Sequence, residues 1–186
     1  MRYYERYRFC PACGVSYPEN AFDKAAIVYR CSECSYEFFQ HSYPSATAVI
    51  PKQDNESEVL LIARGIEPNI GLLALPGGFT DYGEHPERTV VRETREEVQI
   101  EITDIRFLCA TLVDYLYEGM HICVLEHAYL AAAIDSAPKQ IDNNETESIG
   151  FYDVFEVLSN PSMLAFPEHM NVLTHYVKTL PSHKQL

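Results

Sequence analysis

Short apolar runs separated by polar turns shape the middle of the chain. Ala46–Ile50 and Glu58–Ala63 are predicted to be strands, and the polar segment Lys52–Ser57 is the turn between them. Further strands are expected near residues 103–113 and 121–133, and a short last strand at residues 149–153 follows a polar loop.

A helical period replaces this pattern between Pro86 and about Val98. At about 100° per residue, Val90, Val91, Thr94 and Val98 fall on one arc that can face a core. Pro86 suits the first turn of a helix, where its missing N–H is not needed. Residues 154–158 and 167–180 also look helical, and this order of strands and helices indicates a mixed α/β fold.

The arc beside the core-facing one carries three glutamates, Glu93, Glu96 and Glu97. Side chains three and four residues apart are neighbours on a helix, so these carboxylates repel one another unless a cation lies between them. Magnesium and manganese, which prefer oxygen ligands, would fit. The alternative is a solvated acidic face balanced by nearby arginines. The turn Gly77-Gly78 upstream favours the metal, because glycines let backbone groups approach a ligand such as phosphate closely.

The N-terminal segment carries a different metal pattern. Cys10 and Cys13 form one C-x-x-C pair and Cys31 and Cys34 a second, with roughly 17 residues between the pairs. Four thiolates complete a tetrahedral zinc shell, and a segment this short needs a metal because it buries little core. Two disulfides or four unrelated thiols are the alternatives. We expect a small zinc-ribbon β module over residues 1–43 and a second domain over residues 44–186.

Composition narrows the range of partners. The 186 residues are 47% hydrophobic, enough for a packed core, and their formal net charge is -13. Such a surface repels nucleic acid and anionic membranes, and residues 1–41 hold equal numbers of basic and acidic side chains. The first residues lack the apolar core of a secretion signal, and no apolar run reaches the roughly 20 residues of a membrane span. We expect a cytoplasmic protein in which Cys109 and Cys123 are buried, inert thiols.

The segment Gly78–Ile100 resembles the Nudix box. Five residues separate Gly78 from Glu84, and seven separate Glu84 from the run that starts with Arg92. The pattern continues as Arg-Glu-aliphatic-any-Glu-Glu-any-Gly-aliphatic, which matches at Arg92, Glu93, Glu96 and Glu97. Two positions depart from it: Thr94 replaces an aliphatic residue, and Gln99 stands where a glycine would end the helix in a left-handed conformation. Neither departure removes a proposed metal ligand, so we expect them to affect the stability of the protein and not its chemistry.

This resemblance implies an α/β/α sandwich around a mixed sheet. It implies hydrolysis of a diphosphate linkage in a nucleoside diphosphate joined to another group X. Catalytic Mg²⁺ or Mn²⁺ would be held by Glu93, Glu96, Glu97 and the Gly77 carbonyl. Glu93, or an acid from a later loop such as Glu145, would accept the proton of the attacking water. Arg92 would orient the glutamates, and Glu84 would act from outside the group of ligands.

The substrate is less well defined. A zinc ribbon before a Nudix domain is similar to the layout of NADH pyrophosphatases, but their Ser-Gln-Pro-Trp-Pro-Phe-Pro motif is absent, since the chain has no tryptophan. Tyr115 and Tyr117 could stack on a base, although such tyrosines are more often half-buried packing residues. Arg64 and Gly78 could meet phosphate, and a surface charge is the equal alternative for Arg64.

We expect a small-molecule nucleotide substrate, that is, a nucleotide sugar, a dinucleotide or a nucleoside triphosphate. No nucleic-acid or membrane partner is expected, and a homodimer is left open. The alternative is a nucleotide-sensing or partner-binding zinc-ribbon protein with little hydrolase activity, which the intact set of acids disfavours.

Overall fold

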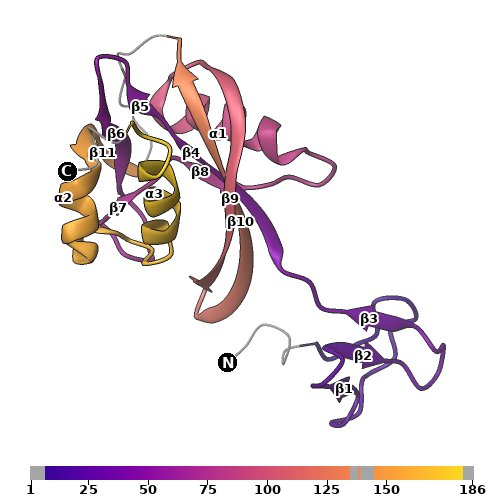
Figure 1. Ribbon diagram of the computed structural model, residues 1–186. Coiled ribbons are helices and arrows are strands. Elements are labelled where there is room, and N and C mark those ends of the chain that lie inside the picture. The colour runs from indigo at the N-terminus through magenta and orange to yellow at the C-terminus, as the bar shows by residue number, and fades with distance from the viewer. Residues whose placement is uncertain (1–6, 135–137, 139–144, 182–186) are drawn as a thin grey trace. The chain divides into compact units, whose positions relative to one another are not determined.

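A computed structural model describes residues 7–134, 138 and 145–181 of the 186-residue chain (Figure 1). Its contacts divide the chain into two compact units. One unit comprises Met1–Ser42 together with Asp114–Cys123, and the other comprises Tyr43–Val113 together with Val124–Leu186.

The first unit is built on a small antiparallel sheet. Its strands, in spatial order, are β1 (Phe22–Asp23), β2 (Val28–Arg30) and β3 (Glu37–Phe39). Val28 and Tyr29 are buried, and the Tyr29 ring contacts the rings of Tyr7, Tyr17 and Phe22. An apolar core of this size is too small to stabilise a domain without a metal or another cross-link.

The second unit contains a mixed sheet. Its strands, in spatial order, are β8 (Gly77–Phe79), β4 (Tyr43–Val49), β10 (Met120–Ala133) and β9 (Ile102–Tyr117). β4 runs parallel to β10, with Tyr43–Val49 opposite residues 124–130, whereas β8 is antiparallel to β4. Glu118 and Gly119, between β9 and β10, have φ values of 46° and 76°, as a two-residue type I′ hairpin turn requires.

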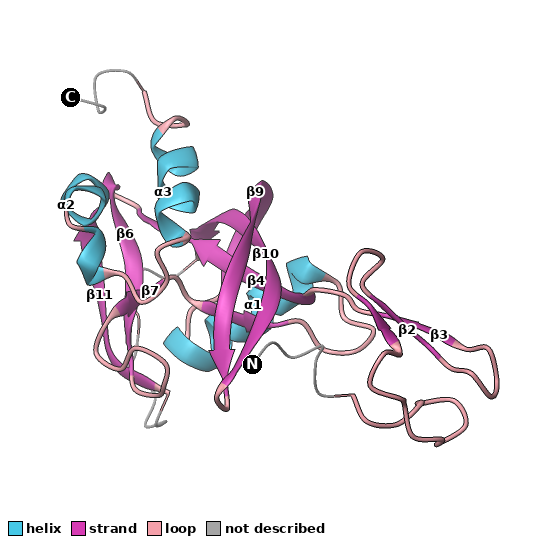
Figure 2. Cartoon of the chain, turned by 90° about the horizontal axis from the view of Figure 1, so that it is seen from below, coloured by secondary structure: helices cyan, strands magenta, loops and turns pink. Residues whose placement is uncertain are grey.

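A second sheet packs beside the first and is antiparallel. Its strands are β11 (Thr146–Asp153), β6 (Asn55–Arg64) and β5 (Pro51–Lys52), in that order, with β7 (Leu73–Ala74) also paired to β6. The helices are α1 (Pro86–Val98), α2 (Val154–Ser159) and α3 (His169–Val177), with a 3-10 turn η2 (Pro161–Met163). Figure 2 distinguishes these helices from the strands by colour. No helix among the described residues is long and apolar enough to cross a membrane.

Alternation along the strands directs side chains into two cores. Ala48 of β4 belongs to a core that includes Val90 of α1. The next residue, Val49, belongs to another core that includes Leu173 of α3. The strands therefore lie between α1 on one side and α2 and α3 on the other (Figure 1), which confirms the predicted α/β sandwich with a mixed sheet.

The ends of the helices and strands differ from the predicted ends mainly where a strand pairs with another strand that is distant in the sequence. α1 has the predicted bounds, whereas α3 is shorter than residues 167–180. β11 starts at Thr146, inside the predicted polar loop, because that end pairs with Arg64 of β6. The rest of that loop, residues 135–137 and 139–144, falls outside the described residues.

The prediction that both isolated thiols are buried was wrong. Cys109 is half-buried and Cys123 is exposed. In β10 the flanking residues Ile122 and Val124 are buried. The strand therefore alternates between a covered and an open face at this point, and Cys123 points to the open one.

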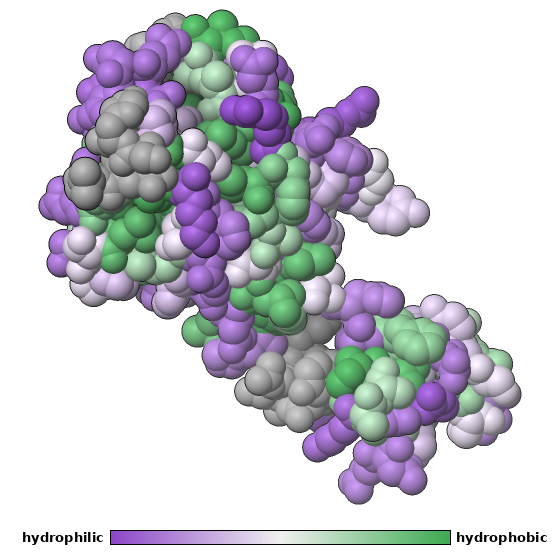
Figure 3. Space-filling view, in the orientation of Figure 1, coloured by the Kyte–Doolittle hydropathy of each residue, from purple (hydrophilic) through white to green (hydrophobic). Residues whose placement is uncertain are grey.

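Apolar side chains reach the surface along the edge strand β9. Phe107, Leu112, Leu116 and Tyr117 are 58%, 60%, 43% and 48% exposed. Figure 3 shows apolar surface along the hairpin between polar areas. An edge strand of this kind is a surface on which another chain could pair.

Candidate active site

A glycine turn forms one wall of the candidate site. Gly77 has a φ of 152°, and a Cβ there would collide with the backbone of Ala46 and with Thr47. A Cβ on Gly78 would collide with the carboxylate of Glu93. Gly77 therefore needs glycine, because the β4 backbone approaches it closely, whereas a side chain at Gly78 would have to displace the Glu93 carboxylate.

Helix α1 presents the acids and has defined ends. His85 precedes Pro86 and accepts a hydrogen bond from the N–H of Glu87 through Nδ1 at 3.4 Å. Gln99 ends the helix with φ 54° and ψ 34°. The left-handed conformation expected at this non-glycine position is confirmed, and it costs on the order of 1 kcal/mol. Thr94 is fully buried, as its place on the core-facing arc predicted.

Glu97 is the most buried acid of α1, with 8% of its surface exposed. Its Oε2 atom accepts a hydrogen bond from the Gly77 N–H at 2.8 Å. Burial raises the pKa of Glu97 to about 8; the Gly77 hydrogen bond opposes the rise, and the charges of Glu93 and Glu145 add to it. An ionised Glu97 therefore requires a positive partner.

Arg92 connects the other acids. Its guanidinium lies 2.7 Å from Glu93, 3.0 Å from Glu84 and 3.1 Å from Glu96, and it donates to the Phe79 carbonyl at 3.0 Å. The hydrogen bond from Arg92 lowers the pKa of Glu84 to about 2. Burial raises the pKa of Glu93, although Arg92 opposes the rise. One half-buried cation thus fixes three carboxylates in a single network.

Two predicted site residues are more exposed. The Glu96 side chain is 58% exposed and pairs with Arg92. Glu145 is exposed, and its backbone carbonyl accepts a hydrogen bond from the Gly65 N–H at 2.7 Å. The negative charge of Glu145 contributes to the raised pKa of Glu93 and of Glu97, so the start of β11 brings a further acid to the group on α1.

Arg64, at the end of β6, holds the loop that follows it. It donates to the carbonyls of Pro68 and Glu67 at 2.8 Å and 3.3 Å, and its guanidinium lies 5.0 Å from the centre of the Phe166 ring. Its charge also acts on Glu97, whose pKa it lowers. Arg64 is therefore near the acids while also engaged with its own loop.

The oxygen atoms at this turn suit a hard divalent cation. The carboxylates of Glu93 and Glu97 lie against backbone that has no side chains at Gly77 and Gly78. Carboxylate and carbonyl oxygens are the ligands that Mg²⁺ prefers.

Four thiols converge in the first unit, where Cys10, Cys13, Cys31 and Cys34 place their sulfur atoms within 4.8 Å of one another. The Cys10–Cys34 and Cys13–Cys31 sulfur distances are 3.8 Å and 3.6 Å. Sulfurs in a tetrahedron at about 2.3 Å from zinc lie ~3.8 Å apart. The geometry fits one four-coordinate metal, and all four cysteines are free of disulfides.

The two tyrosines predicted to stack on a base lie on β9. Tyr115 is half-buried and Tyr117 is 48% exposed. Both belong to the segment Asp114–Cys123, which groups with the first unit. Their role in substrate binding stays a prediction.

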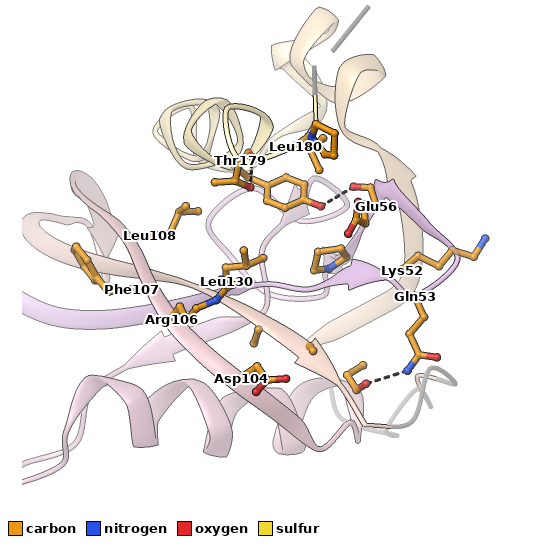
Figure 4. A pocket seen from close by; sticks show the side chains of 16 residues that line it. Lys52, Gln53, Glu56, Asp104, Arg106, Phe107, Leu108, Leu130, Thr179 and Leu180 are labelled. Atoms are coloured by element: carbon orange, nitrogen blue, oxygen red, sulfur yellow. Dashed lines mark hydrogen bonds between the residues drawn. The ribbon is translucent and has the colours of Figure 1, made fainter. Parts of the chain in front are cut away.

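A separate cavity of about 610 Å³ lies between β5, β9, β10 and the end of α3 (Figure 4). Its charged lining residues have both signs: Lys52, Arg106, Glu56 and Asp104. This balance does not favour a diphosphate. Glu56 and Arg64 lie near opposite ends of β6, roughly 26 Å apart at 3.3 Å per residue, so the cavity is well removed from the acids.

One buried pair near the glycine turn was missed by the sequence analysis. The side chains of His169 and Glu126 are both 3% exposed and meet at 3.0 Å. No spacing links two residues so far apart in the chain. The available signal was an acid at an apolar position of a strand, between Val124 and Ala128, since a buried carboxylate needs a partner.

Comparison with known proteins identifies a family and several relatives. The family model of the NUDIX domain matches residues 42–173. A protein from Vibrio vulnificus named NAD-capped RNA hydrolase NudC is 31% identical over 100 residues, which cover 54% of this chain and 36% of that protein. The protein of that name from Pectobacterium carotovorum is 26% identical over 139 residues, covering 75% and 50%. The chain thus matches half or less of the length of these relatives.

Solved structures share the fold. The NUDIX domain of Shewanella oneidensis NrtR, complexed with ADP ribose, gives a TM-score of 0.62 at 25% identity and covers 77% of this chain and 91% of that one. A NUDIX hydrolase from Nitrosomonas europaea gives a TM-score of 0.63 at 21% identity, with 94% of each chain covered.

Proposed function

Because the chain belongs to the NUDIX family, we propose that it is a metal-dependent diphosphohydrolase acting on a nucleoside diphosphate linked to a group X. The observation that carries this proposal is the buried Glu97 carboxylate, bonded to the Gly77 N–H and flanked by Glu93 against Gly78. A buried acid with a raised pKa beside a second acid is costly for stability, and it is the arrangement expected of a site that binds a cation.

The proposed ligands of Mg²⁺ or Mn²⁺ are Glu93, Glu96, Glu97 and the Gly77 carbonyl. A bound divalent cation supplies positive charge to the diphosphate and lowers the pKa of water. Glu97 presents one oxygen to the Gly77 N–H, which leaves its other oxygen available as a ligand. Glu96 can join because its side chain is exposed and only its bond to Arg92 has to be given up.

We propose Glu93 as the general base, with Glu145 as the second candidate. Glu93 is the first candidate because its carboxylate lies directly against Gly78, beside the carbonyl proposed to hold the cation and its bound water. Arg92 orients Glu93 at 2.7 Å, and Glu84 holds Arg92 in turn at 3.0 Å. Arg92 and Glu84 are therefore proposed to orient the acids rather than to touch substrate.

The substrate proposal stays at the level of chemical class. The relatives are named for NAD-capped RNA, and the NrtR domain was solved with ADP ribose. The shared chemistry is an adenosine diphosphate joined to a second sugar. We propose a small molecule of this class, with nucleotide sugars and nucleoside triphosphates as further candidates, and expect the net charge of -13 to disfavour RNA.

The cysteine site is proposed to bind one structural Zn²⁺, because four cysteine ligands leave no open position for catalysis. We also propose a ribbon at residues 1–43, a hydrolase domain at residues 44–186 and a homodimer. Elemental analysis tests for the zinc, and the mass of the protein in solution tests for the homodimer.

A substrate panel tests the proposed activity. The full chain is incubated with ADP ribose, NAD, NADH, nucleotide sugars, nucleoside triphosphates and an NAD-capped RNA oligonucleotide, with Mg²⁺ and with Mn²⁺. Products are separated by ion-exchange chromatography, and the Glu97→Gln variant is the control for a contaminating hydrolase. We expect the native protein to hydrolyse at least one compound of the panel and the Glu97→Gln variant to leave that compound intact. Binding of a nucleotide without turnover under any of these conditions would favour the sensor alternative.

A further inference from the structure

The glycine turn has a second anchor, made by His169 at the start of α3 and Glu126 in β10. Their Nε2 and Oε1 atoms lie 3.0 Å apart, and both side chains are 3% exposed. The other ring nitrogen of His169, Nδ1, accepts a hydrogen bond from the Leu75 N–H at 3.3 Å. Because Nδ1 accepts, the ring proton lies on Nε2 and is donated to Glu126. Glu126 thus fixes the tautomer that Leu75 requires.

Leu75 leads directly to the proposed metal ligand, and three consecutive residues there are each held by a different element. The Leu75 N–H bonds His169 of α3. The Pro76 carbonyl accepts from the Ala48 N–H of β4 at 2.9 Å, and the Gly77 N–H bonds Glu97 of α1. The ring of Pro76 also locks its own φ. The Leu75 hydrogen bond is therefore one of three consecutive anchors that together fix the position of the Gly77 carbonyl.

Thr47 of β4 lies against the glycine turn. Burial on its own would raise the pKa of Glu126, but the neighbouring His169, followed by Thr47, lowers it. Thr47 lies opposite Gly77 in the β4–β8 pairing, and its side chain would touch a Cβ placed there. Within the described part of the chain its hydroxyl makes no hydrogen bond of standard geometry.

A buried carboxylate and imidazole are a poor choice for stability alone. Both groups lose hydration, and apolar residues of similar volume often stabilise a core as well or better. We propose that His169 and Glu126 are positioning residues for the metal site, which hold Leu75 so that the Gly77 carbonyl stays in place. This inference rests on the proposed function, because it concerns the same metal ligands.

The test measures Mn²⁺ binding to the full chain by electron paramagnetic resonance, together with hydrogen exchange of the Leu75 amide. His169→Leu removes the acceptor, so Mn²⁺ affinity should fall at least ~10-fold, the size of effect seen when a ligand loses its support. The Leu75 amide should exchange faster in this variant. His169→Asn places a carbonyl oxygen near the position of Nδ1, so affinity should return to within about threefold of the native protein.

Tyr176→Phe is the matched control. Tyr176 is also buried in α3, but its hydroxyl bonds the Glu56 carbonyl at 2.6 Å, away from the glycine turn. This variant should lower the melting temperature and leave Mn²⁺ binding unchanged. Native Mn²⁺ affinity in His169→Leu would overturn the inference, as would an equal loss of affinity in Tyr176→Phe.

Two further outcomes are decisive. If His169→Leu does not fold, Glu126→Leu takes its place: it removes the acceptor of the His169 Nε2 proton, and Mn²⁺ affinity that stays at the native value would overturn the inference. If the native protein does not bind Mn²⁺, or if Glu97→Gln leaves its binding unchanged, the proposed metal site itself fails, and this inference fails with it.

Discussion

Glu97→Gln separates the metal-site hypothesis from a purely structural role for the acids. Glutamine has nearly the same shape, and its amide oxygen can still accept the hydrogen bond from the Gly77 N–H. What the substitution removes is a negative charge in a position that is 8% exposed. If Glu97 is a metal ligand, turnover should fall by orders of magnitude, since a neutral amide holds a divalent cation far less well.

The same substitution should stabilise the metal-free protein in a pH-dependent way. Burial raises the pKa of Glu97 from an ordinary 4.5 to about 8, so the folded state binds a proton that the unfolded state releases. Glu97 therefore does not reduce the stability of the metal-free native protein below pH ~4.5, and it reduces that stability progressively as the pH rises toward 8. At about 1.4 kcal/mol per pKa unit, the upper limit of this loss is about 5 kcal/mol. The glutamine variant does not lose stability in this way. The difference in the free energy of unfolding between variant and native protein should therefore be absent near pH 5 and largest above pH 8.

The assay is urea unfolding of native and variant protein at pH 5, 7 and 8.5, with and without Mg²⁺. Mg²⁺ is removed by dialysis rather than by EDTA, so that the cysteine site keeps its metal. Added Mg²⁺ should stabilise the native protein at pH 8.5 and leave the variant unchanged. Near-native turnover in the variant, or a variant less stable than the native protein in metal-free buffer at pH 8.5, would refute the reasoning.

Three other substitutions have defined outcomes. Gly78→Ala places a methyl group against the Glu93 carboxylate, so turnover should drop at least ~10-fold while most of the fold persists. An unchanged kcat would contradict the close approach of Glu93 to Gly78. Gln99→Gly should raise the free energy of unfolding by about 1 kcal/mol without altering kcat, because glycine adopts the φ of 54° without strain; a lower stability in urea would count against it. Elemental analysis should find about one zinc per native chain and less in Cys13→Ser. This variant should lose thermal stability, while the protein that remains folded keeps its turnover. A well-folded Cys13→Ser protein without turnover would contradict the structural role.

Local periodicity was sufficient to predict α1 and its ends. The bounds Pro86 and Val98 and the burial of Thr94 follow from 3.6-residue spacing, which is a property of neighbouring residues, whereas the left-handed Gln99 followed from the glycine at that place in the Nudix box. The convergence of the four cysteines also followed from spacing alone. In both cases the relevant partners lie within a short stretch of chain.

Features made by distant pairing could not be predicted in the same way. The parallel pairing of β4 with β10 joins residues about eighty positions apart, and it decides which face of β10 is covered. Cys123 was assigned to a core for lack of that information. The contact between Glu126 and His169 depends on the same pairing and on where α3 is placed, so no spacing in the sequence points to it.

Glu97, Ala48 and His169 each hold one residue of the glycine turn by a hydrogen bond. Side chains at the free surface of the neighbouring loops take no part in that support: Tyr82 is fully exposed, and Ile66 and Ile70 are 38% and 54% exposed. Replacement of Tyr82 or Ile70 would therefore leave the hydrogen bonds of Leu75 and Gly77 undisturbed, so the surface of these loops can vary in sequence while the geometry of the glycine turn is conserved.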